Sequence, residues 1–292
     1  GCSAGRGLCG HAGIHGDSGE TAHAAAVASG MGPISVGTDG AGSVRIPASF
    51  CGNFGLKPSF GRVPAYPLSP MGTVAHLGPH SMSVTDAALM MNVLKQPDAR
   101  DWTSLPFDSS DYTIGLNDGI RGLKIAYSPT LGFARNVHPD VAAAVDAAVR
   151  QLETLGAHIE QMDPGFEDPL EITTGLWFSG AWTVWSSLTP EQQAVADPDF
   201  RAEALLGEKI TALELQRLTL RRGALGSHMR QFMQRHDLLV TPTVAVPAFD
   251  ARPAGHSPMD SATMLGWTPF SYPFNLTQQP ACTIPCGLSH EG

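Results

Sequence analysis

The spacing of hydrophobic and polar positions in the middle of the chain predicts a strand, a helix and a second strand. Apolar side chains alternate over 123–127 and again over 157–161, and between them positions 141–155 follow helical spacing. Gly156 stands where such a helix would end. A strand, helix and strand in this order predict a right-handed crossover between parallel strands, so we expect an α/β protein.

The same patterning predicts a set of elements on either side of this unit. They are a tightly packed helix ending near Gly30, a short buried strand over 33–37, a long helix over about 201–235 and a buried strand over 238–240. The polar, turn-prone segment 97–111 is expected to be a surface linker. The predicted class is therefore α/β, with a mixed central sheet flanked by helices.

Composition narrows the range of partners. The chain has 292 residues, of which 42% are hydrophobic and 15% charged, a profile typical of a folded protein. Its net charge of −9 argues against binding to a nucleic-acid backbone. No apolar run is long enough to cross a bilayer, so neither a nucleic acid nor a membrane is an expected partner.

Cysteine and histidine usage argue against disulfides and metals. Five cysteines occur without paired CxxC spacing, at Cys2, Cys9, Cys51, Cys282 and Cys286. This favours a reducing compartment, and we expect a cytoplasmic protein. Eleven histidines are scattered with no HExxH motif, so no metal site is expected. Cys282 and Cys286 flank a short predicted strand, where buried packing is expected.

The first sixteen residues differ from the rest of the chain. Residues 1–16 have neither helical nor strand periodicity and no long apolar core of a signal peptide. They are interpreted as an atypical or non-native segment ahead of a domain over 17–292.

The most informative segment is 37–47, with the sequence GTDGAGSVRIP. A loop of small residues after a strand can direct several amide N–H groups at an anion. It can be a phosphate cradle, an oxyanion hole beside a nucleophilic Ser43, or a glycine turn with a buried serine. No GxxxxGKS or GxxxxGKT motif is present, the only nearby lysine is Lys57, and GxSxG is also absent. These residues alone leave the three interpretations open.

Read continuously, residues 24–64 (AAAVASGMGPISVGTDGAGSVRIPASFCGNFGLKPSFGRVP) closely resemble the defining motif of the amidase signature family. The resemblance continues through 72–94 and returns at 239–247 and 274–285. It implies an α/β amidase that hydrolyses a small-molecule carboxamide through a serine acyl-enzyme, with no metal or organic cofactor. A homodimer is compatible with this reading.

The resemblance also implies roles for individual residues. Ser43 matches the acylating serine of a Ser–Ser–Lys triad. The amides expected to form the oxyanion hole are those of Gly40, Ala41, Gly42 and Ser43. Asp39 and Arg45 flank this loop and are expected to support it, and Lys57 is expected to belong to the framework rather than to act as the base.

The sequence departs from the family pattern in front of this loop. Where the family has a GGSSGG motif with its bridging serine, this chain has Gly16-Asp-Ser-Gly-Glu-Thr. A count without gaps reaches Gly19, so Ser18 fills the role only with a slip of one residue. The family's catalytic lysine lies further upstream, whereas the lysines here are Lys57, Lys95, Lys124 and Lys209.

These departures, and the absence of the family's closing strand and helix beyond about residue 287, suggest a domain incomplete at both ends. They motivate the alternative of a catalytically impaired fragment or a non-catalytic ligand-binding homologue. A glutaminase subunit of a tRNA-dependent amidotransferase is a lesser alternative, and an anion-binding module a weaker one.

Two further sets of side chains have less specific patterns. Asp163, Glu167 and Asp168 follow a predicted strand and are expected to be solvated. A tryptophan series can line an acyl pocket or form a helical core stripe, and the sequence leaves both open for Trp177, Trp182 and Trp185.

Overall fold

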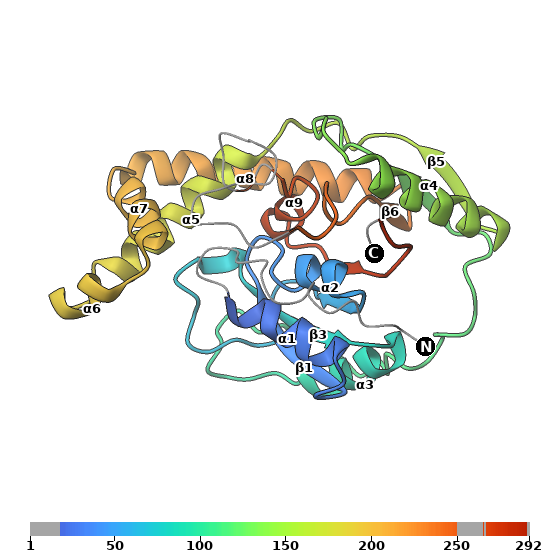
Figure 1. Ribbon diagram of the computed structural model, residues 1–292, viewed down its shortest axis with the longest axis horizontal. Coiled ribbons are helices and arrows are strands. Elements are labelled where there is room, and N and C mark those ends of the chain that lie inside the picture. Colours follow the sequence, from blue (N-terminus) through green and yellow to red (C-terminus); the bar gives the residue numbers. More distant parts are fainter. Residues whose placement is uncertain (1–17, 250–264, 266, 291–292) are drawn as a thin grey trace.

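The computed structural model describes residues 18–249, 265 and 267–290, with side chains from residue 22 onward (Figure 1). The predicted segment 1–16 lies outside the described residues. Within the described part, the helices and strands form two sheets, with helices packed against each (Figure 1).

The first sheet is antiparallel and carries the 37–47 segment. Its strands are β1 (Ile34–Asp39), β2 (Phe54–Lys57), β3 (His76–Ser81) and β7 (Ala281–Thr283), in the order β1-β3-β2-β7. A Cβ at Gly78 would lie 1.8 Å from the Leu56 carbonyl oxygen, so only glycine fits where β3 meets β2. Helices α1 (Ser18–Ala28), α2 (Arg45–Cys51) and α3 (Val84–Leu94) contact this sheet.

The second sheet is parallel and contains the predicted crossover. Its order is β5 (His158–Gln161), β4 (Lys124–Tyr127) and β6 (Leu238–Val240). Between β4 and β5 runs α4 (Pro139–Thr154), which ends before Gly156 at a φ of 98°. The periodicity thus predicted each element of this unit correctly. Leu238 is 47% exposed, because β6 is an edge strand, so the expectation of a buried strand was wrong there.

The helices between and after the sheets are α5 (Leu170–Trp185), α6 (Pro190–Val195), α7 (Pro198–Gly207), α8 (Ala212–Phe232) and α9 (Tyr272–Leu276), with a 3₁₀ turn at Gly72–Val74. The single helix predicted over 201–235 is in fact two helices. A Cβ at Gly207 would lie 1.9 Å from the Phe178 carbonyl oxygen, which places the end of α7 directly against α5. A capping box of Thr211 and Glu214 then starts α8.

The predicted α/β class is confirmed, and among the described residues the antiparallel pairings lie in one sheet and the parallel pairings in the other. The strand predicted over 33–37 continues to Asp39, because Thr38 and Asp39 pair with Leu77 and His76. Segment 97–111 contains no helix or strand, as expected for a linker.

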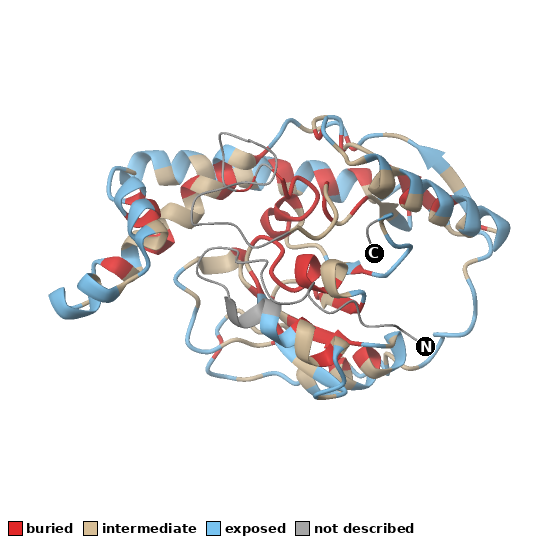
Figure 2. Cartoon of the chain, in the orientation of Figure 1, coloured by how far each residue is buried: buried red, intermediate tan, exposed pale blue. Residues whose placement is uncertain are grey.

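Buried residues gather where α9 and the turn before α2 lie between the two sheets (Figure 2). The apolar cluster beside them joins the parallel sheet to α5 and α8 and consists of Val74, Ala126, Ile172, Leu225, Met229, Phe232 and Leu276. The loop after β1 is therefore held inside the molecule rather than on its surface.

Candidate active site

The loop of residues 40–44 connects the end of β1 to the start of α2. Ser43 is only 9% exposed, and its hydroxyl makes no hydrogen bond to another described residue. The backbone amides of residues 40–43 likewise donate to no described residue, whereas the next amide, that of Val44, points to Asp39 Oδ2 at 3.4 Å. Four consecutive N–H groups therefore have no acceptor among the described residues, a condition that an oxyanion hole requires.

A buried ion pair brackets this loop. Arg45 Nε and Nη2 donate to Asp39 Oδ2 and Oδ1, each at 2.9 Å, and the two side chains are 3% and 0% exposed. Burial by itself would raise the pKa of Asp39. The charge and hydrogen bonds of Arg45 outweigh it and hold this pKa well below its ordinary value. Asp39 and Arg45 therefore form an ionised, bidentate clamp across the loop.

Helix α9 closes the clamp from the other end of the chain. Arg45 donates to Asn275 Oδ1 at 2.5 Å and to the Ser271 carbonyl at 2.9 Å. Asn275 Nδ2 donates to Asp39 Oδ1 at 2.8 Å, and Ser271 Oγ donates to the Ala41 carbonyl at 2.6 Å. The sequence reasoning missed both residues. The only available signal was that Asn275 lies in the 274–285 stretch that resembles the family.

Side chains are opposed at two glycines of the loop, to different degrees. Gly42 has a φ of 140°, and a Cβ there would lie 2.5 Å from Ile46 Cδ1 and 2.7 Å from Ser271 Oγ. A Cβ at Gly40 would lie 2.8 Å from Cζ3 of Trp177. Substitution at Gly42 is thus opposed by both backbone and packing, whereas at Gly40 only one side-chain ring stands in the way.

Lys57 lies fully buried beneath this arrangement. Its Nζ donates to the carbonyls of Pro58, at 3.3 Å, and Gln279. Burial lowers its pKa well below the ordinary value, and the Arg45 charge acts in the same direction. These contacts tie β2 to the segment after α9, which supports the expected framework role.

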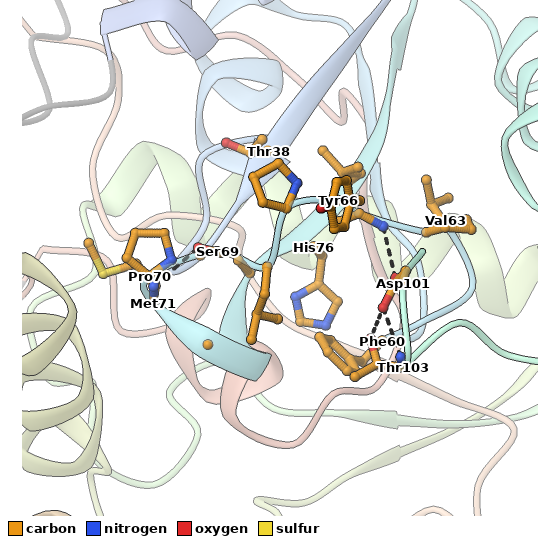
Figure 3. Close-up of a pocket in the computed structure, with 18 of the residues that line it drawn as sticks. Thr38, Phe60, Val63, Tyr66, Ser69, Pro70, Met71, His76, Asp101 and Thr103 are labelled. Carbon is orange, nitrogen blue, oxygen red and sulfur yellow. Dashed lines mark hydrogen bonds between the residues drawn. The ribbon is translucent and has the colours of Figure 1, made fainter. Parts of the chain in front are cut away.

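A cavity of about 590 Å³ opens beside the loop. Gly40 is the residue of the 40–43 loop that lines it, and Ser43 is not among the lining residues. Much of the wall is apolar and comes from 60–72, together with Trp177 and Phe200. Figure 3 shows His76 beside Phe60, with ring centroids 5.5 Å apart, and Asp101 hydrogen-bonded to Thr103. The linker 97–111 therefore contributes to the cavity.

The predicted tryptophans, acidic residues and cysteines lie in different environments. Of the three tryptophans, Trp177 lines the cavity, whereas Trp185 is buried in the core between α5 and α7 and Trp182 packs against that core. Asp163 and Asp168 are exposed, although they accept hydrogen bonds from Ser128 and Tyr272. Cys282 and Cys286 are both exposed, so the expectation of buried packing was wrong for both.

Three further expectations concern Ser18, metal-binding groups and membrane-spanning helices. Ser18 is the first residue of α1, and its side chain lies outside the described residues. No group of three or more histidine, cysteine or acidic side chains able to hold a metal occurs in the described part. In the same part, none of the helices has the length and apolarity that crossing a membrane requires.

The chain is similar to known amidases over most of its length. The Amidase family matches residues 18–292. An acylamidase of Rhodococcus erythropolis is 35% identical over 275 residues, covering 92% of this chain and 57% of the relative. A glutamyl-tRNA(Gln) amidotransferase subunit of Synechococcus sp. (strain CC9902) is 34% identical over 295 residues, with 92% and 60% covered.

Solved structures agree with this result. The crystal structure of a bacterial aryl acylamidase superposes with a TM-score of 0.83 at 29% identity and covers 92% of this chain and 59% of that one. A 6-aminohexanoate cyclic dimer hydrolase gives 0.80 at 25% identity, with 92% and 61% covered. The chain thus spans about three fifths of the length of these relatives, and by its sequence and its fold it belongs to the amidase family.

Proposed function

We propose that this protein hydrolyses carboxamides through an acyl-enzyme formed on Ser43. The observation that carries this proposal is the loop itself, with four consecutive amides free of described partners beside a serine whose hydroxyl is also free of them. The buried Asp39–Arg45 clamp holds the loop before substrate arrives, so the donors need no reorganisation as charge develops.

In the proposed reaction, Ser43 Oγ attacks the amide carbonyl and its proton passes to a base. The carbonyl oxygen becomes an oxyanion that accepts hydrogen bonds from the amides of residues 40–43. The C–N bond then breaks, the amine leaves with the proton, and water hydrolyses the acyl ester. Ser18 is our candidate for the serine that bridges Ser43 to the base.

Lys57 does not suit the role of base. Its Nζ is committed to two backbone carbonyls and is fully buried. The other lysines are Lys95, Lys124 and Lys209, all downstream of Ser43. Lys95 is occupied by the Ser110 carbonyl. Lys124 and Lys209 are exposed. None of the four lysines is therefore proposed as the base, and we expect the chain as given to be catalytically impaired.

The wall of the cavity favours an apolar amide. Aromatic, proline and methionine side chains form one part of its lining, which suits burial of an acyl or aryl group. A second candidate is a glutaminase activity, because one of the relatives is named as an amidotransferase subunit.

A fluorophosphonate probe tests the proposal, because it reacts covalently with a serine held beside an oxyanion-binding loop, even slowly when the base is missing. We expect slow labelling at Ser43, located by mass spectrometry of the peptide, and none in Ser43→Ala. Ser69→Ala is the matched control, since Ser69 lines the same cavity and should leave labelling unchanged. Labelling that persists in Ser43→Ala would refute the nucleophile. Amide binding without any labelling would favour the non-catalytic alternative.

A further inference from the structure

A carboxyl group in the cavity wall has no role in the reaction described above. Glu203 lies on α7, lines the cavity and is only 8% exposed. Its Oε2 accepts a hydrogen bond from the indole Nε1 of Trp177 at 3.1 Å. Its Oε1 is buried and has no partner among the described residues. The hydrogen bond of this carboxylate is thus to a ring on the neighbouring helix.

The other end of that ring meets the loop. Trp177 comes from α5, and its Cζ3 lies where a Cβ of residue 40 would approach to 2.8 Å. Gly40 does not have the positive φ that would exclude a side chain, so the indole is what opposes an alanine there. Glu203, Trp177 and Gly40 therefore form a continuous series of contacts from α7 to the first amide of the loop.

The indole needs this support because it is only half-buried. One side of Trp177 borders the cavity. The bond to Glu203 is the polar contact of this side chain among the described residues. Without it, the ring can leave Gly40, and the cavity changes width beside the proposed reaction centre.

We propose that Glu203 is a positioning residue that determines substrate size, because it holds Trp177 against Gly40 and so sets the width of the cavity where the acyl group enters. The size limit rests on the proposed function, whereas the positioning itself does not. When the Glu203–Trp177 hydrogen bond is present, acyl groups that are broad next to the carbonyl are excluded from the cavity. When it is absent, the cavity admits them.

A double-mutant cycle on stability tests the positioning without any need for turnover. Gly40→Ala is introduced into the unchanged chain, into Glu203→Gln and into Glu203→Leu, and unfolding is followed in urea. An anchored ring cannot yield to the new methyl group, so we expect the unfolding equilibrium constant to rise about tenfold. Gln keeps an acceptor oxygen and should preserve that effect. Leu removes the acceptor and should reduce the effect to about twofold.

If Glu203→Leu does not fold, Trp177→Phe replaces it, because Phe lacks both the N–H donor and the ring carbon nearest to Gly40. An equal effect of Gly40→Ala in all backgrounds would overturn the proposal. That result is independent of catalysis, so it cannot be confused with failure of the proposed function.

The size limit is read from labelling of Ser43 by a small and a bulky alkyl fluorophosphonate. In Glu203→Leu we expect the bulky-to-small rate ratio to rise about tenfold, the scale on which apolar pockets discriminate small groups. Glu203→Gln should stay within about twofold of the unchanged chain, which a general loss of stability would not explain. An unchanged ratio in Glu203→Leu would overturn the size role. If Ser43 is labelled in no variant, the proposed function fails and the stability cycle alone decides the positioning.

Discussion

The ionisation of Glu203 should make the stability of the fold depend on pH. Burial raises the pKa of this carboxyl to about 7; the Trp177 hydrogen bond opposes this rise, and the Asp199 and Asp197 carboxylates add to it. The folded state therefore binds the proton more tightly than the unfolded chain does. The contribution of the protonated Glu203 carboxyl to the stability of the fold is complete below the ordinary pKa of 4.5. It is lost as the pH rises through the folded-state pKa of about 7.

The size of the effect follows from these two values. Each pKa unit corresponds to about 1.36 kcal/mol, so full ionisation costs the fold about 3 kcal/mol. Glu203→Gln keeps the shape and an acceptor for Trp177 but cannot ionise. Its advantage over the unchanged chain should grow from about 1 kcal/mol at pH 5 to about 3 kcal/mol at pH 8.

Urea unfolding followed by circular dichroism at pH 5 and pH 8 measures this difference. Glu208→Gln is the matched control, because Glu208 is an exposed glutamate at the end of the same helix. We expect its stability to track the unchanged chain at both pH values. If Glu203→Gln also tracks the unchanged chain, the carboxyl ionises as it does in the unfolded state and the argument from burial is refuted.

Three further results are expected. Gly42→Val should reduce labelling or hydrolysis at Ser43 by at least about 10²-fold, the scale of one lost oxyanion donor, and an unchanged rate would place the loop away from the reaction. Asp39→Asn leaves Arg45 buried without its counter-charge and should lower the unfolding free energy by about 3–5 kcal/mol in urea melts; a loss below about 1 kcal/mol would contradict the clamp. The 292-residue chain should hydrolyse an aryl amide very slowly. An N-terminal extension carrying a lysine and a GGSSGG-type loop should raise the rate by several orders of magnitude. A normal enzymatic rate in the chain without this extension would mean that another group is the base.

Local patterning was sufficient for the elements that bury one face against their own neighbours in sequence. The unit 123–161 is the clearest case, since alternation and helical spacing each report which side chains face inward. The loop 37–47 was also identifiable, because its small residues permit a backbone shape that larger ones exclude. The clamp of Asp39 and Arg45 was expected from their positions on either side of this loop.

Other features depend on contacts between distant parts of the chain. The helix predicted over 201–235 is interrupted because Gly207 packs on the Phe178 carbonyl, a neighbour that helical spacing cannot reveal. The separation of the strands into two sheets depends on pairings such as β2 with β7, which join opposite ends of the chain. Spacing within a segment carries no information about such partners.

The candidate site likewise has a part that the sequence predicts and a part that depends on the tertiary structure. The sequence by itself determined the residues of the loop, because their types and order are what the chemistry requires. Only the tertiary structure brought Asn275 to Arg45, 230 residues away, and placed Trp177 between Glu203 and Gly40. The physical reason is that a residue's type limits the contacts it can make, whereas the packing of whole helices and sheets decides which of those contacts form.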